Sequence, residues 1–214
     1  MAEYDGSAPG VRELTALTLN KISVGPGDNN CYLLRCRATG AQLMVDAANE
    51  PERLLELCGG RLDAVVTTHH HWDHWEHGLP DVVSATGART YAGAPDVDGI
   101  TVPTDVPLAD GDVIRCGEIA LKVIRLTGHT PGGVALLYDD PGGHPHLFTG
   151  DSLFPGGVGN TFGNADDFAS LFTDVKTKVF DRLPDDTWVY PGHGRDTTLG
   201  AERPALEEWR TRGW

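Results

Sequence analysis

Apolar and polar positions alternate or cluster in three runs near the start of the chain. The runs cover residues 14–24, 30–37 and 41–47, and Gly-rich turns separate them. A period of two between apolar positions is typical of half-buried strands, so we expect an antiparallel meander. A helix over Pro51–Cys58 follows, because Pro stands at its start and Gly59 directly after its end, which is the usual asymmetry of helix termini.

The remaining pattern predicts a second set of strands and further helices. Apolar residues recur roughly every 3.6 positions between Asp166 and Leu183, which indicates an amphipathic helix. A terminal helix over 201–214 is expected to dock through Leu206 and Trp209. The other expected elements are strands at 62–68, 89–92, 113–116, 119–126, 134–138, 146–149 and 187–190, a short helix or turn near 79–86, and a Pro-rich connection through Pro107.

In both halves of the chain, strands are followed by a helix, and this order is typical of the α/β class. We expect two similar sheet-plus-helix layers packed face to face in a single domain over residues 13–214, after a flexible N-terminal segment of residues 1–12. A chain of 214 residues is long enough to bury one core of this kind.

Composition and charge favour a cytoplasmic protein with a small-molecule substrate. Residues 1–10 have neither the basic nor the apolar region of a secretion signal, and no apolar stretch approaches the ~20 residues that span a bilayer. The 4 cysteines have no Cys-x-x-Cys spacing and are expected as buried thiols. The formal net charge of −14 argues against nucleic-acid and anionic membrane partners, since both need a basic surface. No oligomeric state is assigned.

The segment Thr67–His74 reads Thr-Thr-His-His-His-Trp-Asp-His and directly follows an apolar strand. In an extended segment, His69, His71 and Asp73 point to one side. Imidazole and carboxylate together suit zinc, iron(II) or manganese rather than calcium. A solvent-exposed His-rich loop is the simpler interpretation, but the preceding strand and the added Asp-His pair disfavour it.

Three further candidate ligands follow expected strands in Gly-rich turns. They are His129 in Thr-Gly-His-Thr-Pro-Gly, Asp151 in Thr-Gly-Asp-Ser and His193 in Tyr-Pro-Gly-His-Gly. Glycine lets the backbone approach closely and turn sharply, so each turn can aim one side chain at a shared centre. A single histidine of this kind is more often structural, but ligands from several strand ends can meet at one edge of a sandwich.

Taken together, these motifs resemble the metallo-β-lactamase fold superfamily, whose signature is a His-x-His-x-Asp-His block followed by a lone His, a lone Asp and a final His at strand ends. All of these positions are filled between Leu14 and Gly194. The resemblance implies an αββα sandwich with two divalent metal ions, expected to be zinc, with iron or manganese as alternatives. It places His69, His71 and His129 on one metal, Asp73, His74 and His193 on the other, and Asp151 between them.

Within the superfamily, the chain is similar to the hydroxyacylglutathione hydrolase (glyoxalase II) branch through Leu126–Gly132 and Gly150–Phe154. This similarity implies hydrolysis of a small thioester, or of a related ester or lactone, by a metal-bridging hydroxide that Asp73 orients as a catalytic residue. The true β-lactamases usually carry Cys where Asp151 stands, so β-lactam hydrolysis is not expected.

The chain departs from the glyoxalase II pattern at three places. Glu76 and His77 replace a usual Gly-Gly pair, and Asn160 replaces a basic residue. Only about twenty residues follow His193, where the family has a helical domain that helps to hold glutathione. We therefore expect a thiol carrier other than glutathione, or a plain ester or lactone.

Other interpretations remain open. A persulfide dioxygenase would use the same motif block with a single iron, although the chain lacks the Arg-rich stretch of that branch after Asp151. A non-enzymatic module would close its ligands around zinc, and a lactonase would share the hydrolytic site. His70, His144 and His146 are expected to be structural or solvated, whereas His77 is left unassigned.

Overall fold

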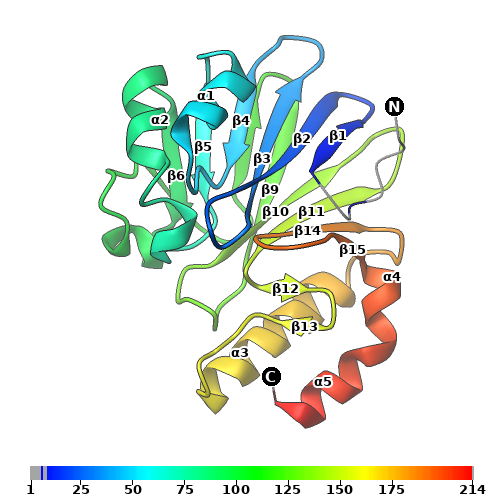
Figure 1. The fold of residues 1–214 in the computed structure, drawn as a ribbon. Helices are drawn as coiled ribbons and strands as arrows, with labels where there is room; N and C mark the ends of the chain where they lie inside the picture. Colours follow the sequence, from blue (N-terminus) through cyan, green and yellow to red (C-terminus); the bar gives the residue numbers. More distant parts are fainter. Residues whose placement is uncertain (1–5, 7–8, 214) are drawn as a thin grey trace.

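Two β-sheets lie face to face and carry helices on their outer faces (Figure 1). The computed structural model of the protein describes residue 6 and residues 9–213. Helices α1 (Pro51–Cys58) and α2 (Leu79–Thr86) cover the first sheet, and α3 (Ala165–Asp174) and α5 (Leu206–Arg212) cover the second. This arrangement is the αββα sandwich expected from the sequence.

The first sheet has seven strands that lie in chain order. Pairing is antiparallel from β1 to β4 and parallel from β4 to β7, because helical connections carry the chain back between the later strands. The elements are β1 Gly10–Glu13, β2 Leu17–Val24, β3 Asn29–Cys36, β4 Gln42–Val45, β5 Ala64–Thr67, β6 Arg89–Gly93 and β7 Val106–Leu108, with 3₁₀ turns η1 Trp72–His74 and η2 Ala94–Gly99.

The second sheet has six strands in the order β15-β14-β11-β10-β9-β8. Only β11 and β14 pair in parallel within it, since the helical layer connects them. The elements are β8 Val113–Cys116, β9 Ile119–Arg125, β10 Val134–Asp139, β11 Pro145–Gly150, β14 Trp188–Pro191 and β15 Thr197–Thr198, the hairpin β12 Leu153–Phe154 and β13 Gly157–Val158, a π-helical segment Val175–Phe180, α4 Leu199–Glu202 and a 3₁₀ turn Arg203–Ala205.

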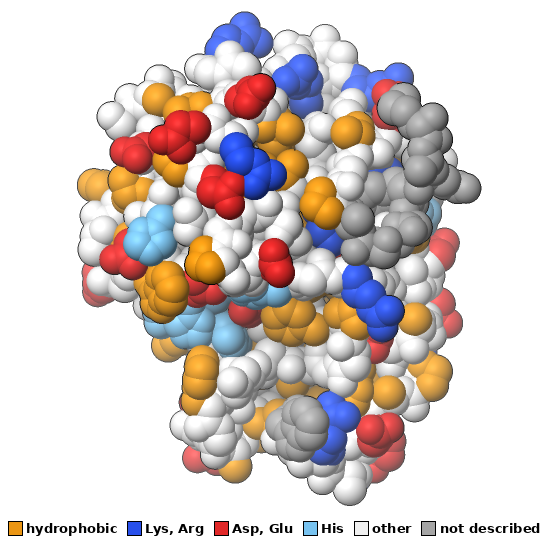
Figure 2. Space-filling model, in the orientation of Figure 1, with side chains coloured by type: hydrophobic (Ala, Val, Ile, Leu, Met, Phe, Trp, Pro, Cys, Tyr) orange, Lys and Arg blue, Asp and Glu red, His pale blue; other side chains and the backbone are white. Residues whose placement is uncertain are grey.

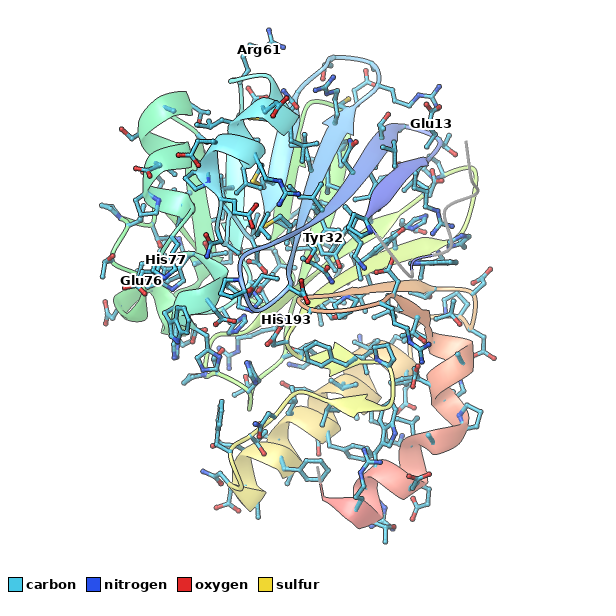
Figure 3. All side chains as sticks on the ribbon, in the orientation of Figure 1. Glu13, Tyr32, Arg61, Glu76, His77 and His193 are labelled. Carbon is cyan, nitrogen blue, oxygen red and sulfur yellow. The ribbon has the colours of Figure 1, made fainter. Side chains whose placement is uncertain are left out.

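Three apolar clusters form the core, one between the sheets and one under each helical layer. In the central cluster, the Tyr32 ring from β3 contacts Phe148 and Tyr190 of the opposite sheet, with ring centroids 5.3 and 5.6 Å apart. The Tyr32 hydroxyl donates a hydrogen bond to the Pro191 carbonyl oxygen at 2.6 Å. This contact fixes the end of β14, and with it the start of the loop that carries His193 (Figure 3).

Several sequence expectations need correction. Gly10–Glu13 pairs with β2, so residues 10–12 do not belong to the flexible segment that was expected over residues 1–12. Residues 1–5, 7 and 8 lie outside the described residues. The Pro-rich connection expected through Pro107 contains η2, and Pro107 itself lies within β7. The helix expected over 201–214 is divided by the turn that contains Pro204, because proline cannot donate the next helical hydrogen bond. Trp209 docks as expected, with 1% of its surface exposed. Among the described residues, no helix is long and apolar enough to cross a bilayer.

Candidate metal centre

The candidate ligands lie at one end of the sandwich, in loops that leave neighbouring strands of both sheets. His69 and His71 follow β5 of the first sheet, whereas His129, Asp151 and His193 follow β9, β11 and β14 of the second. Figure 2 shows histidine side chains gathered where the part of the molecule with α1 and α2 meets the part with α3 and α5. The two sheets therefore supply the two sides of one site.

The His-x-His-x-Asp-His block is extended only in its first half. His71 has φ −62° and ψ 133°, but Trp72–His74 forms the 3₁₀ turn η1. The expectation that Asp73 follows His69 and His71 on one face of an extended chain is therefore wrong. The turn instead brings the adjacent side chains of Asp73 and His74 to the same centre, which a strand could not do.

The structure brings all seven candidate side chains together. Three overlapping groups have their potential ligand atoms within 4.8 Å of one another. These groups are His69 with His71 and His129, His69 with His74 and Asp151, and Asp73 with His74 and His193. Asp151 lies between the two halves: its Oδ2 is 3.7 Å from His129 Nε2 and 3.5 Å from His193 Nε2, and its Oδ1 is 3.4 Å from His74 Nε2.

The outer nitrogens of four of these imidazoles face hydrogen-bond acceptors. His129 Nδ1 lies 2.7 Å from the Asn160 carbonyl oxygen, and His193 Nδ1 lies 2.8 Å from the Gly27 carbonyl oxygen. His74 Nδ1 and His69 Nδ1 face Asp46 Oδ2 and Thr68 Oγ1. Because Nδ1 donates in each case, the lone pair of a neutral ring is on Nε2 and points at the shared centre.

The buried polar atoms fit a metal ion at this centre. His69 Nε2, His129 Nε2 and Asp151 Oδ1 have no hydrogen-bond partner among the described residues. Such groups are costly to bury unless they are paired or coordinate a metal. The inner nitrogens of His74 and His193, which belong to the group with Asp73, also lie only 3.2 Å apart, which suits two ligands of one cation.

Burial and neighbouring charges shift the pKa values of the ligand side chains in different directions. Burial lowers the pKa of His69 well below its ordinary value, and burial, followed by His129, lowers the pKa of His71 to about 4. Burial also disfavours the charged form of His74, but the Asp46 and Asp151 carboxylates outweigh it and raise the pKa of His74 to about 10. The hydrogen bond from His193 holds the pKa of Asp73 below its usual range. A site that favours positive charge on His74 also favours a bound cation.

Gly192 leaves no room for a side chain beside the ligands. A Cβ atom on Gly192 would lie 2.2 Å from Asp151 Oδ1 and 2.7 Å from His74 Cε1. Only glycine lets the strand that leads to His193 pass this close to the two ligands.

Three supporting residues escaped the sequence interpretation. Asp46, at the end of β4, accepts hydrogen bonds from Thr68 N at 2.7 Å and Thr68 Oγ1 at 2.8 Å, besides its contact with His74. Asn29 donates from Nδ2 to Asp73 Oδ2 at 3.0 Å. Asp96 in η2 contacts the loops of His70 and Thr130. Each is a single polar residue beside a turn, and its only signal in the sequence was its place next to a strand or loop.

Two large apolar side chains are exposed beside the ligands. The Phe162 ring is 70% exposed and lies 5.7 Å from the His71 ring and 6.0 Å from the His129 ring, measured between centroids. Trp72, within the ligand block, is 58% exposed and contacts the His77 ring at 5.8 Å. Phe162 has a left-handed φ of 54°, a conformation that non-glycine residues rarely adopt. Phe162 thus presents an exposed apolar ring beside two of the ligand histidines.

The remaining histidines do not join the centre. His70 turns away and contacts Asp96, and the buried His146 bonds the Tyr190 hydroxyl through Nδ1 at 2.9 Å, so their expected structural role is consistent with the geometry. Glu76 and His77 are exposed and lie beside α2 (Figure 3). The Trp75 side chain is buried and donates from Nε1 to the His70 carbonyl oxygen at 2.9 Å, so it packs behind the site. All four cysteines are free and buried, as expected.

Comparison with known proteins gives a consistent family. The profile of the family described as the metallo-beta-lactamase superfamily matches residues 24–193. An uncharacterized protein of Aquifex aeolicus is 31% identical over 208 residues, which cover 87% of this chain and 94% of that protein. A hydroxyacylglutathione hydrolase of Jannaschia sp. is 37% identical over 137 residues, which cover 63% of this chain but only 52% of the enzyme. The chain thus spans about half the length of that relative.

A solved structure supports the same relationship. The crystal structure of TTHA1623 in a di-iron-bound form superposes with a TM-score of 0.71 at 32% sequence identity, and the match covers 86% of this chain and 96% of that one.

Proposed function

The chain belongs to the metallo-β-lactamase superfamily, and we propose that it is a dinuclear metal-dependent hydrolase that cleaves a small thioester, or a related ester or lactone. One observation carries this proposal: two groups of ligand atoms share Asp151, and four imidazoles present Nε2 to the space between them. His69, His71 and His129 would hold one ion, and Asp73, His74 and His193 the other, with Asp151 between them. Zinc suits this mixture of imidazole and carboxylate ligands, with iron or manganese as alternatives.

The protein contributes orientation and charge to the proposed reaction. When bound, two divalent ions would lower the pKa of a water between them from about 15.7 towards ~7 and stabilise the negative charge that develops on the carbonyl oxygen. Asn29 donates to Asp73 Oδ2, the oxygen that also faces His193 Nε2 at 3.4 Å, and so fixes the carboxylate that would orient the attacking water. Asp46 holds the His74 ring in the required orientation. A thiolate leaving group needs little protonation, which suits a site without a spare acid.

Residues beside the ligands support a proposal for the substrate class. Asn160 occupies the place of a basic residue in glyoxalase II, and its Oδ1 accepts a hydrogen bond from Phe162 N at 2.8 Å, so the amide is turned towards its own loop. The exposed Phe162 ring beside His71 and His129 offers hydrophobic contact. We therefore propose that the thiol carrier is otherwise uncharged or apolar and is not glutathione, which carries two carboxylates.

Wider properties of the protein support the same proposal. The net charge of −14 favours a small-molecule substrate over nucleic acid or an anionic membrane surface, and we propose a cytoplasmic location on the composition of the chain. Asp151 stands where the true β-lactamases usually have Cys, so β-lactams are not proposed as substrates.

The test compares two thioesters with the same acyl group on one zinc-loaded preparation. S-lactoylglutathione and an S-lactoyl thioester of an uncharged thiol should differ in kcat/KM, with the uncharged substrate preferred. The variant Asn160→Arg should raise kcat/KM for S-lactoylglutathione by roughly tenfold or more, because a charge-assisted bond is worth ~1.5–3 kcal/mol, and should leave the uncharged substrate unaffected. If S-lactoylglutathione is the better substrate of the wild-type protein by more than about tenfold, the proposed carrier is wrong.

Measurement of oxygen uptake separates the proposed hydrolase from a mononuclear iron persulfide dioxygenase. Iron-loaded protein supplied with a persulfide should consume no oxygen above the metal-only control. Lactones belong in the same substrate screen, since their carbonyl could be attacked at the same centre.

A further inference from the structure

A buried carboxylate next to the metal centre, Asp96, connects two of the ligand loops. Its surface is 0% exposed, and it lies in η2, the turn that leads from β6 to β7. Asp96 Oδ2 accepts hydrogen bonds from His70 N at 3.0 Å and from Thr130 Oγ1 at 2.7 Å. Asp96 Oδ1 accepts from Gly132 N at 2.6 Å and lies 3.1 Å from His70 Nδ1. One carboxylate thus receives donors from two loops that belong to opposite sheets.

The packing around η2 leaves this connection little freedom. A Cβ atom on Gly132 would lie 2.6 Å from Asp96 N, and one on Gly99 would lie 2.8 Å from His70 Cβ. The two ligand loops therefore rest directly against η2, and Asp96 sits between them.

The residues that bond Asp96 lie beside the three histidines of one ligand group, His69, His71 and His129, although the loop after β5 also carries Asp73 and His74. His70 stands between His69 and His71, Thr130 directly follows His129, and Gly132 lies three positions after His129. Each bond to Asp96 is therefore within three residues of one of these histidines. The other group, Asp73, His74 and His193, has further supports: Asn29 bonds Asp73, the Gly27 carbonyl bonds His193 and Asp46 bonds His74. Asp46 also bonds Thr68 beside His69 and so supports both halves of the centre, whereas the bonds to Asp96 all lie near His69, His71 and His129.

We propose that Asp96 is a positioning residue for the His69, His71 and His129 metal site, setting the spacing between the two loops that supply its three imidazoles. This inference rests on the proposed two-metal centre, but not on the identity of the substrate. A carboxylate can accept every bond described here, whereas an amide offers one acceptor oxygen and turns an NH₂ group towards a backbone N–H. Asp96→Asn therefore breaks one side of the connection while preserving the size of the side chain.

The experiment titrates cobalt(II) into metal-free protein and follows visible absorption together with the paramagnetically shifted ring N–H signals of the ligand histidines. The site of His69, His71 and His129 should give three such signals, and the site of Asp73, His74 and His193 should give two. We call them the three-signal site and the two-signal site. Supports of this kind typically contribute 10–100-fold to metal affinity, so Asp96→Asn should weaken the three-signal site by roughly that factor. The two-signal site should keep its affinity to within about threefold.

A matched control and a second variant complete the design. Asp140 is also buried, at 7% exposure, and accepts a hydrogen bond from Thr15 N at 3.2 Å, but it lies at the opposite end of β10. Asp140→Asn should affect thermal stability without changing either metal site. Thr130→Val removes one donor to Asp96 and keeps the shape of the side chain, so it should weaken the same three-signal site by a smaller factor. This variant tests the proposal if Asp96→Asn does not fold.

The outcomes separate clearly. Selective weakening of the three-signal site supports the proposal. Equal weakening of both sites would overturn it. So would titrations of Asp96→Asn and Thr130→Val that overlay those of Asp140→Asn, since Asp96 would then stabilise only the fold. A wild-type protein that binds a single ion overturns the proposed function as well, and this result is visible before any variant is made.

Discussion

His74 Nδ1 lies 3.0 Å from Asp46 Oδ2, and the two side chains are 0% and 2% exposed. Asp46 comes from the end of β4, whereas His74 comes from the 3₁₀ turn beyond β5. A histidine that gives its outer N–H to a carboxylate presents a fixed and more basic inner nitrogen, which is how metal-binding histidines are usually held. The pair therefore links the first sheet directly to the candidate metal centre.

Replacement of this carboxylate should weaken the centre without disturbing the backbone. Asp46 has a left-handed φ of 56°, which asparagine tolerates, so Asp46→Asn keeps the local conformation. We expect metal affinity to fall by roughly 10–100-fold, measured by chelator competition. Asp28→Asn is the matched control, because Asp28 is exposed and has a similar φ of 51°. Equal effects of the two substitutions would contradict the role of Asp46.

Loss of a ligand should separate catalysis from folding. His69→Ala and Asp151→Ala remove groups that lie outside the three apolar clusters of the core. We expect hydrolysis to disappear while the circular dichroism spectrum of the wild-type protein is retained. An unfolded variant would show instead that the metal is structural.

Phe162 should contribute to substrate binding although its backbone conformation is strained. Its left-handed conformation costs about 1–2 kcal/mol in a non-glycine residue, and glycine in turn loses about 0.5–1 kcal/mol of chain entropy. Phe162→Gly should therefore keep the free energy of unfolding within about 1 kcal/mol of wild type. KM for an apolar thioester should rise several-fold with kcat unchanged, whereas Phe162→Tyr, which keeps the ring, should leave KM near its original value. An unaltered KM in Phe162→Gly would remove Phe162 from the binding surface.

His146 should make the protein less stable in acid. Burial, followed by the charge of Arg12, lowers the pKa of His146 to about 3, whereas an unfolded histidine titrates near 6.5. Between these values the unfolded chain binds the extra proton, so this contribution to stability is present above about pH 6.5 and is lost as the pH falls towards 3. His146→Gln should reduce the slope of unfolding free energy against pH in this window by up to about 1.4 kcal/mol per pH unit. Urea unfolding measures the slope, and the exposed His77→Gln is the control; a slope equal to wild type in His146→Gln would contradict the account.

The sequence was most informative where chemistry and periodicity coincide. The block from His69 to His74, together with His129, Asp151 and His193, could be selected because each member follows an apolar run that becomes a strand. Long elements were also predictable: the helix over Pro51–Cys58 has the bounds that the pattern indicated, since its termini carry their own signals.

Elements and residues that depend on distant partners could not be predicted in this way. Strands such as β7, β12 and β15 have two or three residues and form only because a neighbouring strand or turn is already in place. Asp96 stands in a Pro-rich stretch without periodicity, and its four contacts are made with residues at least 26 positions away. The sequence predicted an extended chain with alternating side chains at Trp72–His74, but this segment forms a 3₁₀ turn. In this turn both Asp73 and His74 reach the same centre, which is formed with residues distant in the sequence.

Hydrolysis should require two metal ions held by the seven converging side chains. The direct measurement is the initial rate of hydrolysis of the uncharged S-lactoyl thioester as zinc is added stepwise to metal-free protein, with bound zinc determined in the same samples. We expect the rate to rise and reach its plateau at about two zinc ions per chain, because seven ligands exceed what one tetrahedral ion uses. A full rate without metal, or a plateau at one ion with no further gain from the second, would contradict the account.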